Sequence, residues 1–253
     1  MKQKTHRDLS AFTLVEVIVL IVIIGLLALV FLPKLANRNY QGPIPWDCVN
    51  NLKEIGTAYR LWAGDNGDLV PAQQAVAKGG WADLLTNANQ GAICWTNYVI
   101  MANELGQAPK LLICRYEERT AADAFTNKLD NSNLSYFVGV SANDLQPQSI
   151  AGGDRNLGPG LFPTNDYGYS PKNGKGNDVA IPTNSSKGPV SWSLKIHSRG
   201  NASGAGNILF GDGSVLQVST ASFNQQWLPN ANPTTNWPAG HVPANPSIRL
   251  VFP

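Results

Sequence analysis

The residue most suggestive of chemistry in this sequence is Glu16, a carboxylate inside an otherwise uncharged apolar run from Phe12 to Leu32. Burying an unpaired carboxylate is unfavourable, so such an acid is expected to meet a cation. If the chain is cut between Ala11 and Phe12, the new α-amino group lies four residues before Glu16, within one helical turn. The ammonium and the carboxylate could then neutralise each other, within one chain or between neighbouring chains.

The cysteines allow one disulfide. The chain has three of them, Cys48, Cys94 and Cys114, and no pair has the C-x-x-C spacing of a zinc or redox motif. We favour a disulfide between Cys48 and Cys114, because Cys94 lies in an apolar run where a small buried thiol is the simpler explanation. The sequence alone does not fix this pairing.

Three aspartates are weak candidates for calcium ligands, because hard cations take oxygens from several carboxylates. They are Asp154, Asp166 and Asp178, in or near a glycine-rich stretch over 152–187 that we expect to form a loop. Their spacing matches no known calcium loop, and acids in such turns are common without a metal. We therefore predict no cofactor and no metal, with calcium as the alternative.

His197 and Asp212 are the pair that a hydrolase would have to place beside a nucleophile. The serines near them have no nucleophile-elbow context. The other histidines are His6 and His241, and no metal-ligand spacing joins them to His197. We predict a structural role for both residues, with no catalytic residue in the chain and no enzymatic activity.

The element that must position Glu16 is the apolar run itself. At the rise of an α-helix its 21 residues would cover about 31 Å, roughly the hydrocarbon thickness of a bilayer. A basic leader over 1–11 precedes it, and the run is too long for the core of an ordinary secretory signal. The sequence therefore predicts a transmembrane and assembly helix over 12–36, followed by a Pro/Gly joint over 37–46.

The start of the chain resembles the N-terminal signature of type IV pilins and of the pseudopilins of type II secretion systems. The matching residues are Ala11, the run Phe12-Thr13-Leu14-Val15-Glu16, Gly25 and Pro33. The resemblance implies that a prepilin peptidase cuts between Ala11 and Phe12 and N-methylates Phe12. It also implies that Glu16 pairs with the amine of an adjacent subunit. The family usually has Gly where this chain has Ala11, so we expect slower processing rather than none.

The resemblance extends beyond the apolar run. The stretch from Cys48 to Pro71 is similar to pilin-like proteins that carry a C-terminal His and Asp-Gly element, and Gly153-Asp154-Arg155-Asn156 fits the same group. Here His197 and Asp212 would form that element, at a wider spacing than usual. Major pseudopilins carry a calcium-stabilised loop near their C-terminal sheet, which is a second motive for the calcium alternative.

Composition describes the rest of the chain. Charged residues make up 14% and the net charge is +2, which excludes the broad basic field of a nucleic-acid-binding protein. The 24 glycines and 17 prolines suit a loop-rich surface with short strands. We predict an α+β, pilin-like fold with one globular head over 47–253. The head would contain an amphipathic helix over 47–63, a loop-rich antiparallel sheet and an irregular C-terminal tail.

The leading functional hypothesis is a structural subunit, assembled through its N-terminal helix into a type II secretion pseudopilus or a type IV pilus-like filament. The expected partners are the prepilin peptidase and methyltransferase, other pilin or pseudopilin subunits, and inner-membrane lipid. The expected location is a single pass through the bacterial inner membrane, with a cytoplasmic N-terminus and a periplasmic head, and afterwards the pseudopilus or a surface filament. The alternative is a membrane-anchored carbohydrate- or ligand-binding module, suggested by the seven tryptophans. A tethered enzyme is less favoured.

Overall fold

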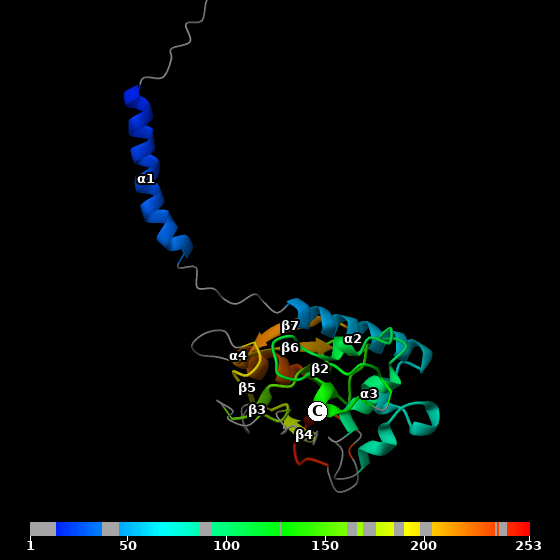
Figure 1. Cartoon of the computed structure of the whole chain (residues 1–253). Coiled ribbons are helices and arrows are strands. Elements are labelled where there is room, and N and C mark those ends of the chain that lie inside the picture. Colours follow the sequence, from blue (N-terminus) through cyan, green and yellow to red (C-terminus); the bar gives the residue numbers. More distant parts are fainter. Residues whose placement is uncertain are drawn as a thin grey trace, which may run out of the picture. The chain divides into compact units, whose positions relative to one another are not determined.

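The chain forms two compact units, Met1–Pro43 and Ile44–Pro253. The computed structural model describes residues 14–36, 46–86, 93–126, 128–160, 166–168, 176–184, 190–197, 204–235, 237 and 242–253. Helix α1 (Leu14–Ala36) belongs to the first unit, and the other elements form the second unit, which we call the head (Figure 1). The predicted leader, the processing residues Ala11 and Phe12, and the joint except Trp46 lie outside the described residues.

Helix α1 corrects the prediction for the N-terminal segment. In the part of the chain that the structure describes, no helix is both long enough and apolar enough to cross a membrane. The predicted fold class, with its transmembrane helix over 12–36, is therefore wrong, and so is the predicted single-pass inner-membrane localisation. The chain combines helices with an antiparallel sheet.

Helix α2 (Trp46–Asp65) begins one residue before the predicted start and carries the expected apolar stripe on its buried face. The stripe recurs every three or four residues, the period of an α-helix, so one side of α2 faces the core and the other faces solvent. Its residues are Val49, Leu52, Ile55, Tyr59 and Trp62, and each is at most 6% exposed.

The main sheet has six strands, all paired antiparallel, in the order β4-β8-β1-β2-β6-β7. Its strands are β1 (Tyr136–Gly139), β2 (Ile150–Asp154), β4 (Asn177–Pro182), β6 (Ala205–Phe210), β7 (Val215–Ser219) and β8 (Ser247–Phe252). Strands β3 (Leu157–Pro159) and β5 (Val190–Trp192) pair with each other in a second, two-stranded sheet.

Short helical turns complete the head. They are η1 (Pro71–Gln73), η2 (Val76–Lys78), η3 (Ala82–Thr86), α3 (Cys94–Ile100), η5 (Pro109–Leu112), η6 (Asn131–Asn133), α4 (Thr220–Ser222), the π-helical η8 (Phe223–Trp227) and α5 (Leu228–Asn230).

Two sequence-based predictions for the head are wrong in part. The C-terminal tail was expected to be irregular, but its end forms β8, which lies between β4 and β1 with all six residues buried. The stretch over 152–187 was expected to be a loop, but it contains the end of β2 and the whole of β3 and β4. In both cases pairing with strands that are distant in the sequence orders a segment whose own proline, glycine and asparagine content favours turns.

The central strands are buried on both faces. Tyr136 and Val138 of β1 belong to one apolar core together with α2, whereas Phe137 between them belongs to a second core. Likewise Leu209 of β6 faces the first core, and its neighbour Phe210 faces the second. Successive side chains of a strand point to opposite faces, so each central strand must supply apolar residues at nearly every position.

Helix α2 lies along the hairpin of β6 and β7 (Figure 1). The closest approach is at Gly56, where an added Cβ would lie 2.7 Å from Leu209 Cδ1 and 3.2 Å from Gly213 Cα. Gly213 has a φ of +82°, which turns the hairpin back towards β7. The absence of a side chain at Gly56 therefore sets how closely the helix can pack on the sheet.

Replacing Gly56 with Val is expected to lower the free energy of unfolding by about 2 kcal/mol, because overpacking a tight contact typically costs about 1–3 kcal/mol. Gly64→Val in the same helix is the matched control, since a Cβ there meets nothing within 4 Å. Urea denaturation of both variants measures the difference. Equal midpoints would show that the contact at Gly56 does not limit packing.

Candidate functional site

Of the features predicted near the N-terminus, the structure describes the assembly residue Glu16 but not the cleavage site. Glu16 lies in the first turn of α1 and is exposed, whereas Ala11 and Phe12 are outside the described residues. Around Glu16, the large apolar side chains between Leu14 and Leu27 are 45% to 78% exposed. The described part of α1 is thus an apolar helix surface with one carboxylate near its start.

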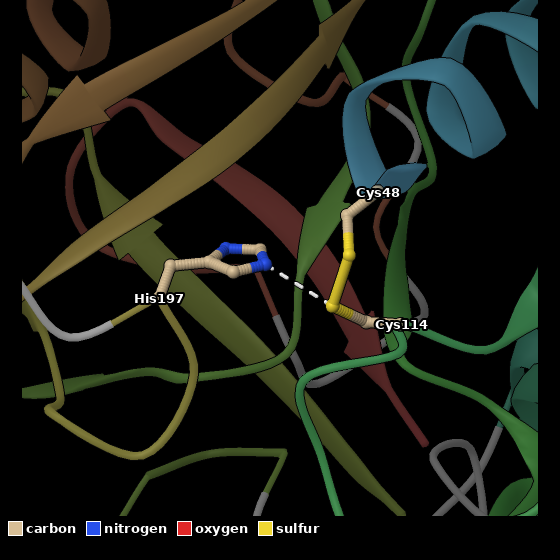
Figure 2. Close-up of side chains that lie close together, drawn as sticks. All are labelled: Cys48, Cys114 and His197. Carbon is tan, nitrogen blue, oxygen red and sulfur yellow. Dashed lines mark hydrogen bonds between the residues drawn. A yellow bond between two sulfur atoms is a disulfide. The ribbon is translucent and has the colours of Figure 1, made fainter. Parts of the chain in front are cut away.

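A disulfide joins Cys48, in the first turn of α2, to Cys114, which follows η5 (Figure 2). This is the pairing favoured from the sequence, and both cysteines are fully buried. Cys94 of α3 is a free, buried cysteine whose Sγ donates to the carbonyl oxygen of Val251 at 3.4 Å. Burial raises the pKa of the Cys94 thiol, so it stays protonated at neutral pH.

The ring of His197 lies against this disulfide and connects it to a buried carboxylate. His197 Nε2 is 3.1 Å from Cys114 Sγ (Figure 2). On the other side of the ring, His197 Nδ1 is 2.9 Å from Asp154 Oδ2, and both side chains are at most 1% exposed. Asn207 donates to the same oxygen through its backbone N–H at 2.6 Å and its side-chain amide at 3.0 Å. Sulfur, imidazole and carboxylate therefore form one continuous buried chain.

The backbone around His197 is held in an unusual conformation. Its φ is +55°, in the left-handed region that few non-glycine residues adopt. Asn156 fixes the segment, because its side-chain amide donates to the carbonyl oxygens of Ser193, Ile196 and Ala205 at 3.0, 3.1 and 3.3 Å. The side chain of Ile196 is fully buried and anchors the residue just before His197.

A buried ion pair is connected to Cys114 through one hydrogen-bonded residue. Arg155 contacts Glu117 Oε2 through Nε and Nη2, both at 2.5 Å, and both side chains are 1% exposed. Ser135 links this pair to the disulfide, because its hydroxyl contacts Glu117 Oε1 and accepts a hydrogen bond from the backbone N–H of Cys114 at 2.7 Å. The position of Cys114 therefore depends on this polar network.

Asp212 has the structural role that the sequence predicted. It lies in the turn between β6 and β7, where its carboxylate accepts from the backbone N–H of Ser214 at 2.8 Å. The carboxylate that contacts His197 belongs to Asp154, a pairing that was not predicted from the sequence. A usable signal was the motif Gly153-Asp154-Arg155-Asn156. In this motif Asp154 contacts His197 and Arg155 pairs with Glu117. Asn156 donates to the carbonyl oxygen of the residue before His197.

The three calcium candidates are each engaged by separate partners. Asp154 meets His197, Asp166 accepts from Ser193 Oγ at 2.6 Å, and Asp178 accepts from Arg249 at 2.7 and 3.1 Å. Burial raises the pKa of Asp166, against the opposing effects of Ser193 and Lys195. Within the described residues, the metal-ligand types that gather closely are instead Cys48, Cys114 and His197, within 4.8 Å. A disulfide has no thiolate, which is the form that binds metals, so we assign no metal ligand here.

A second polar site is a cavity of about 470 Å³ in the head. Its wall includes amide and hydroxyl side chains from segments that are far apart in the sequence, namely Gln73, Ser141, Asn143, Gln146, Asn232 and Thr235. Arg249 also lines the cavity, and its guanidinium lies 5.7 Å from the ring of Trp237. Because Asp178 neutralises Arg249, the cavity wall is polar with little net charge.

Comparisons of this chain with protein-family models, with curated proteins and with solved structures find no match. The resemblance to pilins and pseudopilins therefore rests on the sequence motifs alone. Function has to be argued from the side chains and surfaces described above.

Removing the disulfide with Cys48→Ala and Cys114→Ala together is expected to lower the free energy of unfolding by about 4 kcal/mol. The cross-link closes a loop with a sequence separation of 66, and losing it increases the entropy of the unfolded chain. Urea denaturation under oxidising conditions measures the loss. Cys94→Ala is the control for removing a buried sulfur without a cross-link. Dithiothreitol should destabilise the unmodified protein and the Cys94→Ala control equally, because both contain the disulfide. It should not change the stability of the double variant, which has no disulfide to reduce. A double variant as stable as the unmodified protein would contradict this account.

Proposed function

We propose that this chain is a structural subunit of the pilin or pseudopilin kind, trimmed before Phe12 and assembled with other subunits through α1. The observation that carries the proposal is the apolar surface of α1, whose large side chains from Leu14 to Leu27 are 45% to 78% exposed. A helix that is apolar on all sides is unfavourable in water and is normally buried against other apolar surface.

A second copy of α1 is the partner whose chemistry matches this surface. Burying one Val, Leu or Ile side chain contributes roughly 1.5–3 kcal/mol, so even partial burial along the helix provides a strong driving force for association. A bundle of such helices would also bury Glu16, and a carboxylate in an apolar bundle needs a cation. The α-amino group of a processed Phe12 on a neighbouring copy would supply that charge and fix the stagger between subunits.

The head is suited to a subunit that works in an oxidising environment. Disulfides persist under oxidising conditions, and the Cys48 to Cys114 cross-link ties the start of α2 to the segment after η5. The cross-link holds the first turn of α2 to the rest of the head. A pulling force applied to the chain before Trp46 would therefore act on the cross-linked domain rather than unwind the start of α2.

The processed chain is expected to form high-mass assemblies, whereas a chain that still begins at Met1 should not, because its amine is not placed four residues before Glu16. Glu16→Gln should reduce assembly of the processed chain at least tenfold. Sedimentation velocity measures assembly, and the mass of the N-terminal peptide identifies the first residue. Glu54→Gln on the exposed side of α2 is the matched control and should assemble normally. A processed chain that stays monomeric, or assembles equally well with Gln at position 16, would contradict the proposal.

A second candidate function, binding of a carbohydrate by the head, is favoured by the polar cavity. Its volume of about 470 Å³ is in the range of small-molecule sites. Amides and hydroxyls both donate and accept hydrogen bonds, which matches the hydroxyl groups of a sugar. The neutralised Arg249 favours an uncharged ligand over an acidic one.

A neutral oligosaccharide from a test panel is expected to bind the head, with affinity reduced at least fivefold by Gln146→Ala. Gln146 is an exposed wall residue, so its replacement should leave the fold unchanged. Isothermal titration calorimetry with millimolar sugar measures binding. Gln107→Ala, which lies outside the cavity wall, is the control. Absence of heat with every sugar, or equal affinity in both variants, would exclude this candidate.

A further inference from the structure

We infer that the disulfide between Cys48 and Cys114 is a site of thiol–disulfide exchange, in which His197 and Asp154 stabilise the thiolate of Cys114. The reaction partner would be a dithiol, such as a pair of cysteines on a redox protein. This role is separate from the proposed filament function. It explains why a buried imidazole and carboxylate contact the sulfur of Cys114, which a purely structural cross-link does not require.

The first argument is the proton arrangement at His197. Asp154 Oδ2 lies 2.9 Å from Nδ1, and a carboxylate at that distance holds a proton on Nδ1. In this tautomer the lone pair of Nε2 points at Cys114 Sγ, 3.1 Å away. A disulfide sulfur has no hydrogen to donate, whereas a thiol does. When Cys114 is reduced, its thiol can therefore donate to His197 Nε2, and the hydrogen-bond chain from Cys114 through His197 to Asp154 is complete.

The second argument is the location of Cys48. It lies in the N-terminal turn of the 20-residue helix α2, where the helix dipole and the first N–H groups favour negative charge. Both sulfurs of the disulfide thus occupy positions that stabilise a thiolate. Stabilising the reduced form makes a disulfide a stronger oxidant and easier to open.

The geometry also decides which sulfur is attacked. A disulfide opens fastest when the departing sulfur is the better-stabilised thiolate, and His197 contacts Cys114. An incoming thiolate therefore bonds to Cys48 Sγ, and the electron pair of the broken bond leaves on Cys114 Sγ beside His197. The second thiol of the partner then bonds to the first partner sulfur and releases Cys48. In total, two electrons and two protons pass to the head, and the dithiol becomes a disulfide.

Among the described residues, several charged groups around the site form ion pairs. Asp154 faces the ring from β2, the ion pair of Glu117 and Arg155 lies behind Cys114, and Arg115 meets Asp47 at 3.6 Å on the surface. Burial is the largest effect on Tyr136 and raises its pKa, so this phenol stays neutral.

The residues next to the cysteines in the sequence lie at the surface of the head. The side chains of Asp47 and Arg115, each adjacent in sequence to one of the cysteines, are 56% and 81% exposed. Cys48 itself is fully buried, so a thiol partner reaches its sulfur only when neighbouring side chains move aside.

The first test is a thiolate titration of the full chain carrying Cys48→Ser, followed by absorbance at 240 nm in the presence of EDTA. Cys94 stays protonated because it is buried, so the signal reports on Cys114. We expect the Cys114 thiolate to form at least one pH unit below the ordinary thiol value of about 8.5. Adding His197→Gln should reduce the thiolate fraction at pH 7 at least fivefold. Arg115→Gln is the matched control, because it removes an exposed and screened cation beside the same cysteine, and it should change that fraction less than twofold.

The second test measures the equilibrium between disulfide and dithiol forms in glutathione buffers, using the chain with all three cysteines. His197→Gln should shift this equilibrium at least tenfold towards the disulfide, and Asp154→Asn should shift it in the same direction. If His197→Gln does not fold, Asp154→Asn and the titration of Cys48→Ser alone still decide the question. An ordinary pKa for Cys114, together with an equilibrium that neither substitution moves, would make the cross-link purely structural and overturn the inference.

Discussion

The head depends on a sheet whose central strands are buried on both faces. Alternate side chains of β1 and β6 enter two different apolar cores, so these strands cannot expose a polar face to water. Any polar group in or beside them then has to find a partner inside the protein, because an unpaired buried charge is strongly unfavourable. The charged and amide side chains at the end of β2 meet this requirement by pairing with residues from other segments.

The candidate exchange site follows from that requirement. Three consecutive polar residues lie at the end of β2 and just after it, and each contacts a different neighbour. Asp154 contacts His197, Arg155 pairs with Glu117, and Asn156 donates to the backbone before His197. Through Ser135 the same network reaches the backbone of Cys114. One short segment thus fixes both the imidazole and the cysteine that it contacts. The left-handed conformation of His197 is tolerated because Asn156 and the buried Ile196 hold the chain on its N-terminal side.

The N-terminal unit has a different chemistry from the head. The described part of α1 has almost no polar side chain, whereas α2 has a buried stripe and a solvent-facing side. The first surface suits association between like helices, and the second suits packing within one domain. A filament role and an exchangeable disulfide are compatible, because they use separate residues and separate contacts.

The sequence by itself determined the features that depend on local periodicity and residue type. The apolar helix with Glu16, the stripe of α2 and the preference for Cys48 with Cys114 were all visible as spacing or composition. Only the tertiary structure decided the contacts between distant segments. It placed Asp154 beside His197, made a central strand of the C-terminal residues Ser247–Phe252, and gave each calcium candidate its own partner. Such pairings are set by strand order and by burial on both faces of the sheet, and neither constraint is encoded in the residues next to one another along the chain.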